Sequence, residues 1–214
     1  MTSRFEPNAA RLTVVLDIRY PQAYLALHPA AALARSLGVD VDWLPLPVAT
    51  LKPPSTPAAD DDRGVRHRRH RARLIASEID TYSDIQGLVL RDYYRDGDAE
   101  ALNLGWLWIR ERYPQKLEAY LSEAFRAYWA LELDAADEAR VASLVESFGG
   151  DGKAFLSWLA EEGPALSRAF IDELHERGVF AVPSYLVDDE VFLGRQHLPM
   201  IRWILGGRTG EVPI

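Results

Sequence analysis

Two periods of apolar residues follow one another in the N-terminal part of the chain and predict its first three elements. Leu12 to Ile18, LTVVLDI, form a β-branched run, which suits a buried strand. Helical spacing then begins at Pro21, which suits the first position of a helix, and ends at Gly38, a residue common at helix ends. Val39 to Leu46 alternates apolar and polar residues as a strand does. This order predicts two parallel strands joined by a right-handed helical crossover.

A helix with a charged first half is predicted next. The proline-rich connector Lys52 to Pro57 leads to three acids, Asp60 to Asp62, and negative charge suits a helix N-terminus. From Leu74 onward the helix carries apolar residues, so we expect it to begin solvated and to end packed. The expected packing stripe is Ile75, Ile79, Tyr82 and Ile85.

The middle of the chain is dominated by helical spacing, over residues 99–112, 114–129, 134–148, 152–159 and 164–177. Trp106, Trp108 and Trp129 lie within this part. They either line a hydrophobic pocket or pack in the hydrophobic core, and aromatic residues at helical spacing usually pack in the core.

The C-terminal part predicts a β-hairpin followed by a helix. The strand-like runs Ala181 to Val187 and Val191 to Leu193 are separated by Asp188 to Glu190, which are turn-forming residues. Gly194 closes the hairpin. Helical spacing follows from Leu198 to Leu205, with Pro199 tolerated in the first turn.

The stretch GVFAVPS, Gly178 to Ser184, resembles a sequence typical of one branch of the DsbA-like thioredoxin-fold proteins. That branch contains the 2-hydroxychromene-2-carboxylate isomerases and the kappa-class glutathione transferases. The resemblance implies an α/β thioredoxin-like fold, βαβ…αββα, interrupted by a large all-helical insertion. It also implies a cis bond before Pro183, which exposes the backbone of Val182 to an extended peptide such as glutathione.

A second match begins at the end of the first strand. The family pattern F-D-F-x-S-P-x-x-Y-L-A aligns with LDIRYPQAYLA, residues 16–26. The residues that are kept are Asp17, Pro21, Tyr24 and Leu25. Tyr20 takes the place of the isomerase serine, which is the first cysteine of the disulfide enzymes. The resemblance implies that Tyr20 steadies a glutathione thiolate at a helix N-terminus, where anions are favoured, with Arg19 beside the ligand. The other interpretation is that Tyr20 is a half-buried aromatic residue in an inactive site, and the sequence favours neither.

Basic residues cover every face of the helix in DRGVRHRRHRAR, residues 62–73. Charge runs are usually solvated, so the plainest interpretation is a basic turn that balances nearby acids. In the resembling family, the insertion begins here and its first helix borders the active cleft. By that resemblance, Arg66 and His67 are candidates to bind a carboxylate through charge-assisted hydrogen bonds.

The helix start GRQHL, residues 194–198, departs from the family pattern G-x-D-R-L. Gln196 replaces the aspartate that receives the γ-glutamyl ammonium in glutathione-using relatives, and His197 replaces the arginine. An amide carbonyl accepts a hydrogen bond but supplies no countercharge, and Arg195 would repel an ammonium. The helix N-terminus with Arg195 and His197 suits an anionic ligand instead. His197 as a neutral packing residue is the alternative.

Net charge, hydropathy and residue counts limit the partners, the location and the chemistry that we expect of this protein. The formal net charge of −8 argues against nucleic acid or an anionic membrane as a partner. No run approaches the roughly 18 apolar residues of a membrane span, and MTSRFEPNAARL lacks an apolar signal core, so we expect a cytoplasmic protein. Five histidines without cysteine form no metal motif, so no metal site is expected. Because the chain has no cysteine, it cannot exchange disulfides by its own chemistry.

These patterns predict three parts: an N-terminal βαβ part of the thioredoxin domain (10–58), a helical insertion (59–163) and a C-terminal αββα part (164–208). Two functions fit. The first, implied by resemblance, is a glutathione-dependent isomerase or transferase for an aromatic or conjugated carboxylate, with Tyr20, Val182 and Pro183 at its centre. The second is a catalytically silent binding module. Relatives in the family often dimerise, so the resemblance allows a homodimer.

Overall fold

A four-stranded mixed sheet with the order β2-β1-β3-β4 is the framework of the protein. Strand β1 (Leu12–Leu16) runs parallel to β2 (Val41–Pro45) and antiparallel to β3 (Ser184–Val187), which pairs with β4 (Glu190–Leu193). The computed structural model describes residues 11–213. Residue 10, where the first part was predicted to begin, and the rest of the N-terminal segment lie outside the described residues. All of β1 is buried, as its β-branched run predicts.

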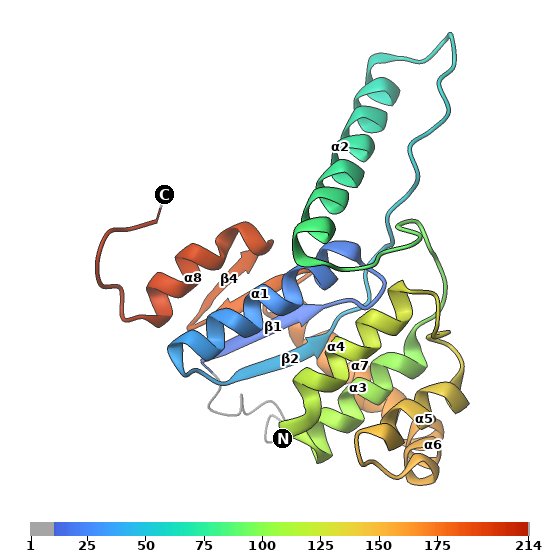
Figure 1. Ribbon diagram of the computed structural model, residues 1–214, viewed down its shortest axis with the longest axis vertical. Coiled ribbons are helices and arrows are strands. Elements are labelled where there is room, and N and C mark those ends of the chain that lie inside the picture. The colour runs from blue at the N-terminus through green and yellow to red at the C-terminus, as the bar shows by residue number, and fades with distance from the viewer. Residues whose placement is uncertain (1–10, 214) are drawn as a thin grey trace.

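Helices α1 (Pro21–Leu37) and α8 (Leu198–Leu205) pack side by side over one face of the sheet (Figure 1). Helix α1 has proline in its first turn and ends at Gly38, whose φ of 62° is left-handed, so the predicted start and stop are confirmed. The short 3₁₀ helix η2 (Arg195–His197) leads into α8, which carries Pro199 in its first turn.

Six further segments form a helical body beyond β2 (Figure 1). They are α3 (Glu100–Arg112), η1 (Pro114–Lys116), α4 (Leu117–Trp129), α5 (Glu138–Ser147), α6 (Gly152–Glu161) and α7 (Gly163–Glu176). The indole nitrogen of Trp106 donates to the carbonyl of Trp43 at 3.0 Å, and Arg110 binds both carboxylate oxygens of Asp42 at 2.7 and 2.8 Å. These contacts fasten α3 to β2. Trp106, Trp108 and Trp129 are all buried in the core, as aromatic helical stripes usually are.

Helix α2 (Arg63–Gln86) projects from the body of the protein (Figure 1). Asp62 caps it by accepting from the N–H of Val65 at 2.7 Å. The predicted packing stripe is only half correct. Ile79 is buried and Ile75 is partly buried, whereas Tyr82 is 39% exposed and Ile85 is 75% exposed. The reason is geometric: the face turned to the protein runs along Ala72, Ala76, Ile79 and Ser83. Tyr82 lies at the margin of that face, and Ile85 lies nearly opposite it.

The element order is therefore β1-α1-β2, a helical stretch, and α7-β3-β4-α8. This is the predicted α/β thioredoxin-like arrangement with a large helical insertion. Within residues 11–213, no helix combines the length and the apolar character that a membrane crossing requires.

A buried ion pair fixes the junction between β1 and α1. Asp17 is 1% exposed and accepts from the main-chain N–H of Arg19 at 2.9 Å and from the Arg19 guanidinium at 2.9 and 3.2 Å. A fourth hydrogen bond comes from the N–H of Val48 at 2.7 Å. The guanidinium also donates to the carbonyls of Val48 and Gly97 at 2.9 and 3.1 Å. Two charged groups thus hold three chain segments together.

Stability should fall steeply in alkali because the helical body buries neutral phenols. Burial raises the pKa of Tyr120 well above its ordinary value, and raises that of Tyr128 to about 12. Above pH ~10 the unfolded chain loses these protons before the folded chain does, so the free energy of unfolding falls by about 1.4 kcal/mol per pH unit for each such tyrosine. Urea denaturation at increasing pH measures this slope.

The variant Tyr120→Phe isolates one of these contributions. The hydroxyl of Tyr120 is buried and has no hydrogen-bond partner within residues 11–213, so its removal leaves no group unpaired. We expect a slope that is shallower by about 1.4 kcal/mol per pH unit above pH ~10. If the free energy of unfolding of Tyr120→Phe fell with pH as steeply as that of the wild type, buried Tyr120 would not be a source of the alkaline instability.

The Asp17–Arg19 pair should dominate local stability. Asp17→Asn removes the negative charge that balances the buried guanidinium, and the amide N–H₂ would face donors. We expect the free energy of unfolding to fall by about 3 kcal/mol. The matched control is Glu123→Gln, in an exposed pair with Arg126 at 2.8 Å, which should cost less than about 1 kcal/mol. Equal losses in the two variants would show that the buried pair is not special.

Candidate functional site

The register of the sheet gathers most of the predicted site residues at one end of it. Val15 of β1 lies opposite Ser184 of β3, and Ser184 lies opposite Leu193 of β4. The residues that follow β1, precede β3 and follow β4 therefore lie at the same end of the strands, which we call the sheet edge. That edge holds seven of the predicted residues: Arg19, Tyr20, Val182, Pro183, Arg195, Gln196 and His197.

Two main-chain groups before β3 have no partner among the described residues, in a residue, Val182, that is 5% exposed. The peptide bond between Val182 and Pro183 is cis, as the resemblance implies. The carbonyl of Pro183 accepts from the N–H of Gly194 at 2.8 Å, which closes the hairpin. In contrast, no hydrogen bond within residues 11–213 uses the N–H or the carbonyl of Val182. Main-chain polar groups normally find a partner, so this pair is available to an external one.

Tyr20 lies at the N-terminus of α1 and is partly buried. Its side chain does not cap the helix, and its own carbonyl accepts from the N–H of Ala23 at 2.9 Å. Burial raises the pKa of Tyr20 above its ordinary value, and the charge of Arg71 partly opposes that rise. The phenol is therefore protonated at neutral pH and can donate a hydrogen bond to an anion.

The guanidinium of Arg19 is already engaged by Asp17 and by two carbonyls. Burial opposes the charge of Arg19, but the hydrogen bond and the charge of Asp17 outweigh it and raise the pKa of Arg19. Arg19 lies next to Tyr20 at the end of β1, and its guanidinium donors bind Asp17 and the carbonyls of two loops.

The three residues after the hairpin also make internal contacts. Arg195 donates to Glu78 at 2.8 Å and stacks over the ring of Tyr82 at 3.2 Å, which ties η2 to α2. The side-chain amide of Gln196 turns back to the carbonyl of Leu193 at 2.8 Å. The ring centre of His197 lies 5.7 Å from that of Phe192, so His197 packs on the hairpin.

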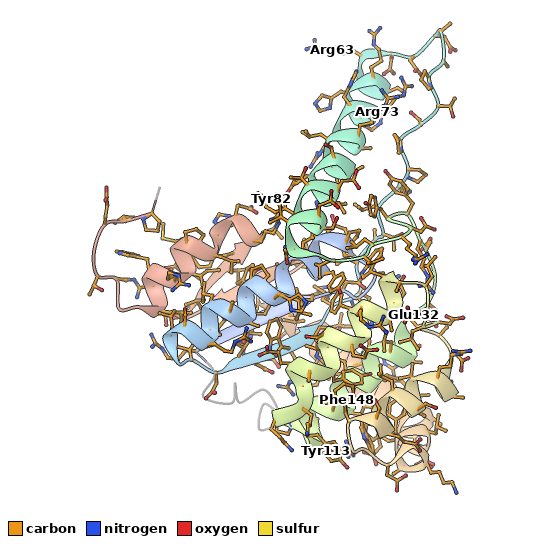
Figure 2. The ribbon with its side chains drawn as sticks, viewed as in Figure 1. Arg63, Arg73, Tyr82, Tyr113, Glu132 and Phe148 are labelled. Atoms are coloured by element: carbon orange, nitrogen blue, oxygen red, sulfur yellow. The ribbon has the colours of Figure 1, made fainter. Side chains whose placement is uncertain are left out.

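Arg66 and His67 are exposed on the projecting half of α2, apart from the sheet edge. Figure 2 shows this half between the labelled Arg63 and Arg73. A different residue of the same basic run, Arg71, is the one whose positive charge partly offsets the rise of the pKa of Tyr20. The spacing of Arg68, Arg71 and Ile75, at intervals of a helical turn, was the signal in the sequence that could have found it.

No group of three or more acidic or histidine side chains in residues 11–213 is arranged to hold a metal ion. The groups that this end of the sheet offers are main-chain hydrogen-bonding groups, a neutral phenol and cationic side chains. Such an arrangement suits a peptide-like anion or thiolate rather than a nucleophilic attack by the protein itself.

Several 2-hydroxychromene-2-carboxylate isomerases are similar to this chain in sequence. The isomerase from Sphingobium xenophagum is 22% identical over 188 residues, which cover 86% of this chain and 92% of the isomerase. That from Pseudomonas putida is 24% identical over 195 residues, covering 89% and 91%.

Solved structures show the same fold. A 2-hydroxychromene-2-carboxylate isomerase superposes with a TM-score of 0.71 at 19% identity, covering 92% of this chain and 95% of that one. The cytosolic disulfide reductase DsbM from Pseudomonas aeruginosa, in its structure with GSH, gives a TM-score of 0.61 at 18% identity, covering 92% and 98%. The family model for the DSBA-like thioredoxin domain matches residues 11–206. The chain therefore belongs to the DSBA-like thioredoxin domain family.

Proposed function

We propose that the protein is a glutathione-dependent isomerase or transferase that acts on an aromatic or conjugated carboxylate. The observation that carries the proposal is the unpaired main-chain N–H and carbonyl of Val182, at the same edge of the sheet as Tyr20. An extended peptide can pair with strand-like backbone whose polar groups have no partner. The isomerase names of the similar sequences support the reaction class, and the DsbM structure with GSH supports the ligand.

In this mechanism the chain orients glutathione and stabilises its thiolate. Val182 pairs with the peptide backbone, while the neutral phenol of Tyr20 donates to the sulfur at the positive end of α1. The thiolate forms a C–S bond to one carbon of a conjugated double bond, and the displaced electron pair moves into the conjugated acceptor. The former double bond is then single and can rotate. The reverse step expels the thiolate, so no glutathione is consumed in isomerisation.

A silent binding module is the second candidate, and the residues after the hairpin favour it. Gln196 supplies no countercharge for an ammonium, and its amide is bonded to Leu193. Arg195 is held by Glu78 and Tyr82. Saturable binding without turnover over a broad panel of conjugated carboxylates would establish this function, and steady turnover would reject it.

A cytoplasmic location agrees with the proposal, because thiols are kept reduced in that compartment. Homodimerisation remains a prediction of the family resemblance. Sedimentation of the full chain measures it directly.

Tyr20→Phe tests the role of the phenol. A hydrogen bond to a charged group contributes about 1.5–3 kcal/mol, so Tyr20 should lower the pKa of the bound glutathione thiol by about one to two units. The ordinary value for a thiol is about 8.5. We expect the wild-type complex to show thiolate absorbance below that pH, and Tyr20→Phe to shift the titration upward.

Tyr113→Phe is the matched control, since Tyr113 is a partly exposed tyrosine of the helical body (Figure 2). It should leave both the thiol titration and the calorimetric affinity for reduced and S-methylated glutathione unchanged. Equal thiol titrations in the Tyr20→Phe and wild-type complexes would remove Tyr20 from the mechanism. Absence of binding at millimolar glutathione would reject the proposed function.

A further inference from the structure

A small pocket lies between α2 and the segment that follows β2. Its volume is about 170 Å³, and its floor is apolar, formed mainly by Leu51, Ile75 and Ile79. Three cationic side chains line it as well: Lys52, Arg68 and Arg71. The pocket therefore combines an apolar floor with concentrated positive charge.

The positive charge of this pocket is not neutralised by the described part of the protein. None of Lys52, Arg68 and Arg71 forms an ion pair with a carboxylate within residues 11–213. The contrast with the adjacent Arg69 is direct. Arg69 is buried, binds Asp61 and donates to the carbonyl of Ser55 at 2.8 Å. In a chain of net charge −8, three unpaired cations around one pocket point to an external anion.

The size of the pocket limits that anion. A water molecule occupies about 30 Å³ of liquid, so the space corresponds to about six waters. Ligand pockets for drug-sized molecules are larger, roughly 300–1,000 Å³. Tyr94 adds an aromatic wall, which suits a flat apolar group. A single ring or a short unsaturated chain fits, and fused rings fit poorly.

Two observations link the pocket to the proposed thiolate site. Leu46 follows β2 and donates from its N–H to the carbonyl of Leu16 at 2.8 Å, so the chain enters this region at the edge that carries Tyr20. Arg71 lines the pocket, and its charge reaches the phenol of Tyr20.

We propose that this pocket binds the carboxylate of a small monocyclic aromatic or short conjugated acid, with Arg68 and Arg71 as the anchoring cations. The ring or chain lies on Ile75 and Ile79. This inference names the substrate class and rests on the proposed function for its catalytic meaning. The binding itself requires no glutathione.

The test is a calorimetric titration of the full chain with trans-cinnamate in the absence of glutathione. Charge-assisted hydrogen bonds contribute about 1.5–3 kcal/mol, which corresponds to about ten- to a hundred-fold in affinity. We expect Arg68→Gln and Arg71→Gln each to weaken cinnamate binding by about tenfold or more. Arg73→Gln is the matched control, because Arg73 is exposed on the same helix and does not line the pocket. It should leave the affinity within about twofold.

Two further measurements test charge and size. The uncharged amide of cinnamic acid and the fused-ring acid 2-naphthoate should each bind at least about tenfold more weakly than cinnamate. Ala76→Leu, which fills the pocket, should abolish cinnamate binding without unfolding the chain, as judged by its melting temperature. The proposal would be overturned if the chain did not bind cinnamate, or if the amide or 2-naphthoate bound as tightly as cinnamate. It would also be overturned if Arg68→Gln and Arg71→Gln bound cinnamate as tightly as the wild type.

Glutathione titration of the same variants separates this inference from the proposed function. Arginine-dependent cinnamate binding without any glutathione binding would retain the pocket and reject the glutathione-dependent enzyme. If the chain binds glutathione but its cinnamate affinity is unchanged in Arg68→Gln and Arg71→Gln, the pocket proposal is rejected and the proposed enzyme function is retained.

Discussion

The buried pair of Asp17 and Arg19 is the constraint on which the rest of the candidate site depends. Removing two charges from water costs several kcal/mol per ion, and that cost is offset only when the geometry is good and the remaining hydrogen-bonding capacity is used. Here one carboxylate accepts four hydrogen bonds, and the guanidinium also reaches the carbonyls of Val48 and Gly97. Because these contacts lie immediately before Tyr20, they fix where α1 begins and which way its N-terminus faces.

This constraint changes how the site can recognise a ligand. Arg19 is committed to the loops and Arg195 to α2, so neither basic residue of the sheet edge offers a free charge. Cations without an ion-pair partner line the pocket between α2 and the segment after β2 instead, and the charge of one of them, Arg71, lowers the pKa of Tyr20 against the effect of burial. The main-chain groups of Val182 remain unpaired. Peptide pairing and anion binding thus use different segments of the chain, the residue before β3 and helix α2.

Local sequence signals were sufficient to predict a helix end or a turn where one residue decides the backbone conformation. Gly38 ends α1 because it adopts a positive φ, and Asp151 caps α6 because its carboxylate accepts from two free N–H groups at 3.0 Å. The hairpin needed only a polar turn between two short apolar runs. The stripe on α2 was predicted too broadly, because apolar spacing shows that Ile79 and Ile85 lie on a helix but not which of them meets the protein.

The sequence by itself determined the order of elements, the thioredoxin-like fold through its resemblance, and the absence of thiol chemistry, because periodicity, short motifs and residue types are local properties. Only the tertiary structure decided which of the many basic residues are free. Arg68, Arg69 and Arg71 look alike in the chain, yet Arg69 is buried against Asp61 while the other two line a pocket. That difference depends on which segments meet around the helix, and contacts between distant segments are not encoded in the local pattern.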